Sequence, residues 1–229
     1  MHYGLYLILL FIVLALSIFA DVGTRITYSK YQKTLTKYNG LDTARLILNG
    51  NQIYGIAVVP VGGTLTDNYS SRNQTVSLSQ EVYSNPSISS VCIAAHELGH
   101  VLQDRKGFKF LEWRHKLVPV TNIANYASYI LLFLGYAFDS LAFFRLGVIV
   151  FSVLVLYELI TLPVEFNASY QAVAQIRRHR ILTEEELKLG KKVLFFAALT
   201  YLSAFLSTLL SFLRLLLQLI LSSKRRDDD

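Results

Sequence analysis

Cysteine, charge and repeated sequence are all scarce in this chain of 229 residues. Cys92 is the only cysteine, which excludes an intramolecular disulfide and a metal cluster held by several thiolates. Charged residues make up 17% of the chain, whereas a soluble domain usually carries about a quarter. No internal repeat and no low-complexity segment is present. With 53% hydrophobic residues, this composition is typical of a membrane protein.

The hydrophobic residues are concentrated in runs long enough to cross a bilayer core of about 30 Å. These runs cover Gly4 to Ala20, roughly 117–138, 141–163, and Val193 to Leu221 within a predicted helix over 193–222. The first run lacks the basic start and the small-residue cleavage site of a secretory signal, so we expect residues 1–20 to be a retained anchor. The sequence therefore predicts a multi-pass protein of the cell membrane, with the lipid bilayer as a partner.

Basic residues are concentrated between the apolar runs, and their positions indicate which segments lie on which side of the membrane. They follow the first run, precede the second and lie between the third and fourth. Lys and Arg accumulate in cytoplasmic loops, so we expect residues 21–116 and 164–192 to be cytoplasmic and the N-terminus to lie outside. The charged tail, 223–229, then falls outside as well, and its Lys224-Arg225-Arg226 leaves a conflict with this rule. Membrane topology thus accounts for the net charge of +6, and we expect no nucleic-acid partner.

The polar segment 21–116 combines helical and strand patterns. Leu41 to Asn49 has the pattern of a short helix, Ile53 to Val61 is rich in β-formers, and Gln74 to Ser79 alternates as a strand does. A helix is predicted from near Ile88, with an apolar stripe at a period of 3.6 residues. We expect a mainly α integral membrane protein with about four transmembrane helices and a small cytoplasmic α+β module.

His96-Glu97-Leu98-Gly99-His100 places an H-E-x-x-H motif on that helix. Residues four apart lie on one helical face, so both imidazoles can bind the same metal ion. Glu97 projects beside them, where it can take a proton from the attacking water. A pair of surface histidines is the alternative interpretation.

A catalytic zinc site needs a third protein ligand. Gln103 and Lys106 stand where a metzincin needs glycine and histidine, which excludes that class. Glu165 follows the third run on the side expected for the motif and opens a predicted helix from Val164 to about Arg180. Ser169 lies one turn later, where its hydroxyl could support the carboxylate. A carboxylate in a first helical turn is also favoured by the helix dipole, so spacing alone leaves the role of Glu165 open.

Several segments resemble the YugP-like bacterial membrane zinc metallopeptidases, which are related to the integral membrane gluzincins of the HtpX and CAAX-prenyl-protease type. The resemblance is carried by Leu65-Thr66-Asp67-Asn68-Tyr69, Val76-Ser77-Leu78-Ser79, Ala94 to Gln103, Thr161 to Ser169, and Ala198-Leu199-Thr200-Tyr201. It implies that Glu165 is the third zinc ligand, in the glutamate position of a Glu-x-x-x-Asp helix. Ser169 replaces the aspartate, so the supporting hydrogen bond falls to Ser169 or Asn167. The resemblance also implies an edge strand that binds extended substrate, for which we expect Gln74, Thr75, Val76, Ser77 and Leu78.

The predicted activity is hydrolysis of peptide bonds in membrane or membrane-proximal proteins, with one Zn²⁺ as cofactor and Glu97 as general base. Tyr170, Tyr201, His115 and His179 remain open as donors to the oxyanion. A zinc-binding membrane scaffold without activity is the first alternative. A small transporter is the second, although transporters usually carry several polar residues at mid-span and these runs carry few.

Overall fold

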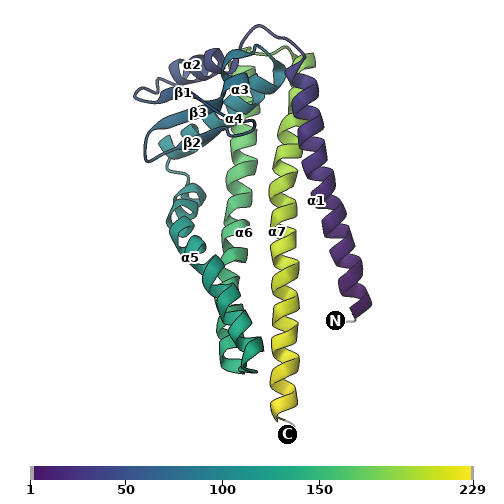
Figure 1. Cartoon of the computed structure of the whole chain (residues 1–229). Coiled ribbons are helices and arrows are strands. Elements are labelled where there is room, and N and C mark those ends of the chain that lie inside the picture. The colour runs from purple at the N-terminus through teal and green to yellow at the C-terminus, as the bar shows by residue number, and fades with distance from the viewer. Residues whose placement is uncertain (1–2, 228–229) are drawn as a thin grey trace. The chain divides into compact units, whose positions relative to one another are not determined.

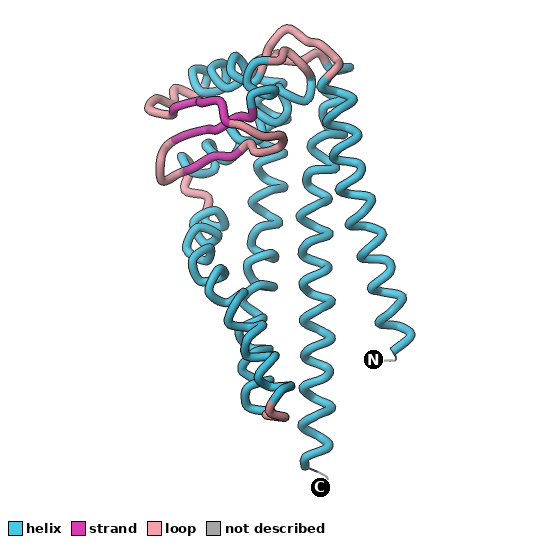
Figure 2. The backbone as a smooth tube through the Cα atoms, in the orientation of Figure 1, coloured by secondary structure: helices cyan, strands magenta, loops and turns pink. Residues whose placement is uncertain are grey.

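The computed structural model describes residues 3–227, which are mainly helical with a small sheet (Figures 1 and 2). The elements in chain order are α1 (Tyr3–Gln32), α2 (Gly40–Gly50), β1 (Ala57–Val61), β2 (Asn68–Ser70), β3 (Thr75–Ser79), α3 (Gln80–Ser84), α4 (Ile88–Arg105), α5 (Lys109–Ala137), α6 (Leu141–Arg178) and α7 (Glu184–Asp227). The chain divides into two compact units. One contains Phe19–Leu111 and Val164–Thr200, and the other contains the described residues up to Ile18, Glu112–Pro163, and those from Tyr201 onward.

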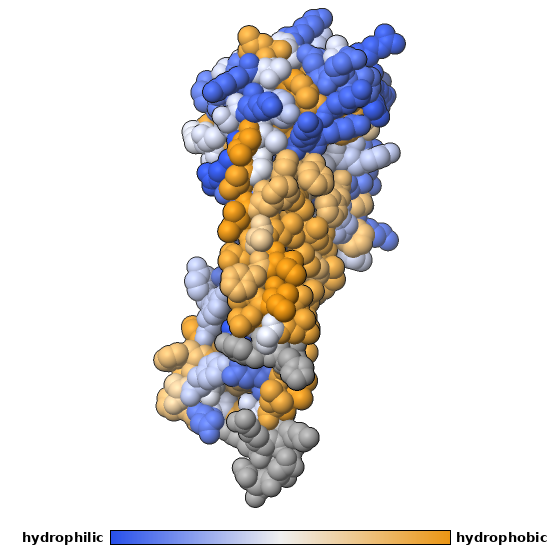
Figure 3. Space-filling view, turned by 90° about the vertical axis from the view of Figure 1, so that its right-hand side faces the viewer, coloured by the Kyte–Doolittle hydropathy of each residue, from blue (hydrophilic) through white to orange (hydrophobic). Residues whose placement is uncertain are grey.

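Four helices, α1, α5, α6 and α7, are long and apolar enough to cross a membrane. Their most apolar windows are largely exposed, and in α1 only 6% of that window is buried. Figure 3 shows hydrophobic side chains gathered over a long continuous surface. A protein surface of this kind is stable against lipid chains and costly in water. The expectation of about four transmembrane helices is therefore confirmed as far as length and composition go.

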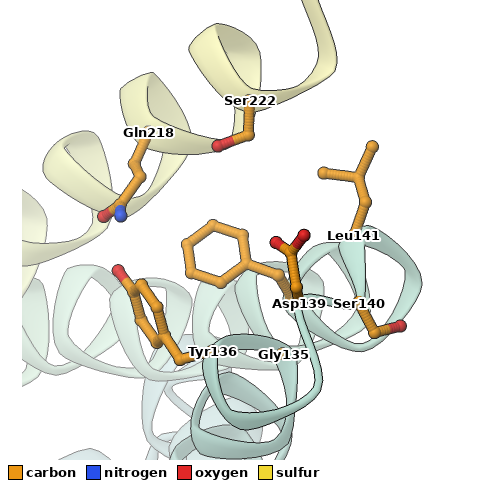
Figure 4. Close-up of a pocket in the computed structure, with 8 residues that line it drawn as sticks. Gly135, Tyr136, Asp139, Ser140, Leu141, Gln218 and Ser222 are labelled. Atoms are coloured by element: carbon orange, nitrogen blue, oxygen red, sulfur yellow. The ribbon is translucent and has the colours of Figure 1, made fainter. Parts of the chain in front are cut away.

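In the unit that contains Glu112–Pro163, α5 and α6 form a close antiparallel pair. A Cβ added at Gly135 would lie 2.8 Å from the Cα of Phe144, and one added at Gly147 would lie 2.9 Å from the backbone nitrogen of Leu132. Small residues at such positions let two apolar helices approach closely where no hydrophobic effect drives them together. Beside the α5–α6 turn, a pocket of about 100 Å³ opens toward Gln218 and Ser222 of α7 (Figure 4).

Helix α6 continues through Pro163 without a break, which differs from the sequence expectation. The third run was expected to end at Pro163 and a new helix to begin at Val164, because proline removes a backbone donor and clashes with the preceding turn. Apolar membrane helices tolerate proline when neighbouring groups satisfy the freed carbonyl. One helix of 38 residues therefore carries both the third apolar run and Glu165.

The core of the other unit is built around α4. The stripe expected from the sequence is buried as predicted, and it consists of Ile88, Val91, Cys92, Ala95, Gly99 and Leu102. Residues from α2, β3, α6 and the first turns of α7 complete this core, including Ile47, Leu78, Ile176 and Leu187. Each large aliphatic side chain buried in this way contributes roughly 1.5–3 kcal/mol. The core therefore holds α4 firmly from several sides.

The helix ends in this unit are closed by side chains. The Asn39 side chain accepts a hydrogen bond from the backbone of Asp42 at the start of α2, and Ser87 accepts one from Ser90 at the start of α4. Before α7, the Glu186 carboxylate accepts from the backbone N–H of Thr183 at 2.8 Å, and the Thr183 hydroxyl accepts from the backbone N–H of Glu186 at 3.2 Å. These two reciprocal bonds form a capping box at the start of α7.

The sheet has the order β1-β3-β2, with β1 parallel and β2 antiparallel to β3. Val76 and Leu78 of β3 are fully buried, as its alternation predicts. The expectation that this strand offers a free edge to substrate is wrong, because β3 is the central strand. Ala57 to Val61 pair along one side of it, and Asn68 to Ser70 pair with Thr75 to Ser77 on the other. The outer edges of the sheet belong to β1 and β2.

Candidate metal centre

The two histidines of the H-E-x-x-H motif lie in the middle of α4, facing α6. His100 is buried and His96 is partly buried, with their ring centroids 4.9 Å apart. Glu165 projects from α6 and is 1% exposed. His96, His100 and Glu165 each offer one ligand atom, and these atoms lie within 4.8 Å of one another. The structure thus brings together three residues that the sequence separates by up to 69 positions.

The spacing of the donor atoms matches the geometry of a small divalent ion. Nε2 of His96 lies 3.2 Å from Oε2 of Glu165, and Nε2 of His100 lies 3.7 Å from the same oxygen. Zinc bonds of about 2.0–2.2 Å at tetrahedral angles separate two donors by about 3.3–3.6 Å. Two imidazole nitrogens and one carboxylate oxygen, with a fourth position open, form a donor set that catalytic zinc uses. The residues therefore fit a zinc ion.

Both imidazoles turn their other nitrogen, Nδ1, toward a hydrogen-bonding side chain. Nδ1 of His96 lies 3.2 Å from the Ser169 hydroxyl, and Nδ1 of His100 lies 3.0 Å from Oε1 of Gln103. Ring nitrogens that face away from a metal are usually held in this way, which fixes the orientation of the ring. Ser169 was expected to support the Glu165 carboxylate, and the structure places its hydroxyl against His96. The helical spacing of Ser169 and Glu165 gave no sign of this contact, because α4 lies far away in sequence.

Asn167 is the other residue expected to support the centre, and its side chain accepts a hydrogen bond from Gln103. The Gln103 amide nitrogen donates to Oδ1 of Asn167 at 3.0 Å and to the carbonyl of Val164 at 2.7 Å. Sequence reasoning used Gln103 only to exclude the metzincins and missed this arrangement. A signal was present, since a residue three positions after His100 lies one turn further along the same helical face.

Gly99 allows α4 and α6 to approach each other closely at the centre. A Cβ at this position would lie 2.5 Å from the carbonyl oxygen of Ala168 and 3.0 Å from its Cα. Real Cβ atoms essentially never come within 3.0 Å of another heavy atom, so any larger residue would force the two helices apart. The glycine between the motif histidines therefore sets the distance across which Glu165 reaches them.

Glu97 follows His96 directly on α4 and is 8% exposed. It lies on the same helix as His96 and His100, at the position that the H-E-x-x-H motif gives its glutamate. Helix α4 is largely buried, and the Glu97 side chain therefore has little contact with bulk solvent. A carboxylate in such a position is well suited to transfer a proton and poorly suited to serve as a surface charge.

The end of α4 is tied to β2 by a cluster of hydrogen bonds. The Tyr69 hydroxyl donates to the Asp104 carboxylate at 2.6 Å, and the Gln74 amide nitrogen donates to the Tyr69 hydroxyl at 3.2 Å. Burial and the neighbouring Asp104 raise the pKa of Tyr69 above its usual value, so the phenol stays protonated as a donor. Gln74 was expected to contact substrate, but its side chain is engaged here and also accepts a hydrogen bond from Arg105. This cluster holds the motif helix against the sheet.

Comparisons with known proteins agree with this geometry. The family described as "Putative neutral zinc metallopeptidase" matches residues 6–220 of the chain. The chain is 41% identical over 212 residues to "Putative membrane protease YugP" of Bacillus subtilis (strain 168), which covers 92% of this chain and 94% of that protein. No solved structure matches the chain. The match covers nearly the whole chain, and the clustered His96, His100 and Glu165 agree with it. The chain therefore belongs to the family described as "Putative neutral zinc metallopeptidase".

Proposed function

We propose that this protein is a zinc-dependent endopeptidase that hydrolyses peptide bonds of membrane or membrane-proximal proteins. The observation that carries this proposal is the convergence of His96, His100 and Glu165, whose ligand atoms lie within 4.8 Å of one another. Glu97 directly follows His96 in the chain. A structural zinc site closes all four positions with protein ligands, whereas a catalytic one leaves a position for water. Three ligands with a neighbouring carboxylate therefore favour catalysis over a structural role.

In this proposal His96, His100 and Glu165 hold a single Zn²⁺. The bound ion would lower the pKa of a water molecule toward about 7 and polarise the scissile carbonyl. Ser169 and Gln103 keep the two imidazoles turned so that Nε2 of each faces the ion. The buried core around α4 keeps these groups at fixed positions, which is what proximity and orientation require.

Glu97 carries the protons. One of its carboxylate oxygens accepts a proton from the attacking water and then delivers it to the leaving nitrogen as the C–N bond breaks. No other proton carrier is required between those two steps. A carboxylate shielded from bulk water makes both transfers without competition from solvent.

We further propose that the centre lies on the cytoplasmic side, in a gluzincin-like α+β module next to the membrane surface. The support is the gathering of Lys and Arg in residues 21–116 and 164–192, which flank the apolar helices. A centre at the membrane surface would have ready access to the loops and tails of membrane proteins. Those segments are the expected substrates.

The experiment compares wild type with Glu97→Gln in a mild detergent, using zinc content and cleavage of fluorescein-labelled casein and of a quenched-fluorescence peptide library. Glu97→Gln should retain zinc and lose cleavage, because the amide keeps the size of the side chain but cannot accept the proton. Glu165→Ala should lose both. Glu185→Gln, at an exposed position in the first turn of α7, is the matched control and should keep both.

A catalytically silent zinc-binding scaffold predicts a different pattern. In that case Glu97→Gln and wild type would bind zinc equally and neither would cleave any probe. Equal zinc content in wild type, His96→Ala and Glu165→Ala would remove the ligand assignment altogether. Cleavage that survives Glu97→Gln would exclude the assigned role of that carboxylate.

A further inference from the structure

Gln103 is a fully enclosed amide between the two helices that carry the metal centre. Its side chain is 2% exposed and is one of the largest buried side chains among the described residues. Two of its three hydrogen bonds join α4 to α6, because Nε2 faces both the Val164 carbonyl and Oδ1 of Asn167. The third lies within α4, where Oε1 faces Nδ1 of His100. Every polar atom of the amide is therefore committed to a partner.

The orientation of this amide is dictated by its partners. A backbone carbonyl can only accept a hydrogen bond, so the group 2.7 Å from the Val164 oxygen must be the NH₂. The second NH₂ hydrogen is used by Oδ1 of Asn167 at 3.0 Å. The opposite arrangement would place two oxygens against each other at 2.7 Å and leave a buried carbonyl unsatisfied. Oε1 of Gln103 is therefore the atom that faces His100.

This orientation determines which nitrogen of His100 carries the proton. An amide oxygen only accepts, so Nδ1 of His100 must donate to it across the 3.0 Å separation. A neutral imidazole with its proton on Nδ1 has its lone pair on Nε2. That lone pair faces Glu165, at 3.7 Å, where a metal ion would sit. The other tautomer would direct an N–H at the carboxylate, and that proton would have to move to Nδ1 before a cation could bind.

We propose that Gln103 is a positioning residue that locks His100 in the tautomer able to bind the metal. It acts on both helices at once, because the carbonyl it binds belongs to Val164, the residue directly before Glu165. This inference rests on the proposed zinc-dependent function, since it assigns Gln103 a role toward the same centre. Asn167 completes the chain of hydrogen bonds by accepting from the same amide.

Nδ1 of the other histidine has no such constraint, and its Nε2 lies 3.2 Å from Oε2 of Glu165. The Ser169 hydroxyl can donate or accept, so its contact with Nδ1 of His96 is compatible with either tautomer. Of the two motif histidines, His100 is therefore the one whose Nδ1 must act as a donor. The position three residues after the motif thus acquires a chemical role that the motif itself does not specify.

The decisive variant is Gln103→Met, which keeps the length of the side chain and removes all three hydrogen bonds. The chain also offers a matched control. Gln175 is 5% exposed, accepts a hydrogen bond from the Asn51 side chain at 2.8 Å and contacts His179 at 3.2 Å. Gln175→Met therefore removes another buried amide that joins two helices and contacts a histidine, away from the candidate ligands.

Two measurements separate positioning from ordinary stabilisation. The first is zinc affinity, determined by competition with a chelating dye. Gln103→Met should weaken it by about 10- to 100-fold, as the loss of a partner that supports a ligand does, while Gln175→Met leaves it unchanged. The second is the ¹⁵N chemical shifts of the His100 ring in metal-free protein, recorded up to alkaline pH so that the neutral ring is observed. Wild type should show the proton on Nδ1, and Gln103→Met should lose that preference.

The second measurement tests the proposal even if zinc binding or proteolysis fails in wild type. A proton on Nε2 of His100 in metal-free wild type overturns it without any variant being made. Zinc affinity and tautomer both unchanged in Gln103→Met would also overturn it, whatever the melting temperature does. If Gln103→Met does not fold, Gln103→Glu supplies the variant. It keeps an acceptor for His100 but places an oxygen against the Val164 carbonyl, so it should hold the tautomer while it loosens α6.

Discussion

Replacing Gly99 with alanine should destroy the metal centre while leaving the fold largely intact. The added Cβ would lie 2.5 Å from the Ala168 carbonyl oxygen, whereas a carbon–oxygen contact needs about 3.3 Å. The two backbones must therefore separate by about 0.8 Å or rotate by a comparable amount. Ligand distances in metal sites tolerate about 0.2 Å. Because Ala168 lies three residues after Glu165 on α6, this movement carries the carboxylate away from both imidazoles.

The magnitudes separate the two consequences. Overpacking at a buried contact costs about 1–3 kcal/mol, and the better helix propensity of alanine returns about 1 kcal/mol. The folded state should thus lose only about 0–2 kcal/mol. Zinc affinity should fall by at least about 100-fold, the upper end of what the loss of a supporting hydrogen bond costs, because a ligand itself is displaced.

The assay is zinc competition together with thermal unfolding of the metal-free protein. Gly4→Ala is the control, since nothing lies within 4 Å of the position of its Cβ. Gly99→Ala that binds zinc as tightly as wild type would refute the reasoning, because α4 and α6 would then tolerate the displacement. A collapse of stability with zinc affinity unchanged in the folded fraction would refute it too.

Three further outcomes follow from other contacts. Tyr69→Phe removes the bond donated to Asp104 and should lower the free energy of unfolding by about 1.5 kcal/mol, whereas Tyr54→Phe, at a residue 75% exposed, should not change it in chemical denaturation. Burial raises the pKa of the Cys92 thiol to about 12, so iodoacetamide near neutral pH should label only unfolded protein. Rapid labelling of the native protein, detected by mass spectrometry, would contradict this. Thr183→Ala removes one half of the capping box and should cost about 1 kcal/mol, measured by thermal unfolding, with an unchanged melting temperature as the contrary result.

The parts of the fold that depend on local pattern were predictable from the sequence. The stripe of α4 follows from the 3.6-residue period, and the start of α7 follows from the Thr183–Glu186 spacing. The pair His96 and His100 is local too, since residues four apart share a helical face. For these features the neighbouring residues contain all the information needed.

The parts that depend on contacts between distant segments were not. Spacing alone could not show that Glu165 meets the histidines, and the resemblance to a known family was needed to suggest it. The alternation of β3 predicts a strand but not its place in the sheet, so its central position came as a correction. The contact between Ser169 and His96 depends on how α4 and α6 cross, which no pattern in either helix records.

The near-complete burial of α4 has a consequence for how this part of the protein fluctuates. Its backbone amides from Val91 to Gln103 are enclosed by residues of several other elements, so no local fraying can reach them. Hydrogen exchange there must wait for cooperative opening of the whole surrounding unit. The helix that carries His96 and His100 should consequently exchange more slowly than the other segments of that unit.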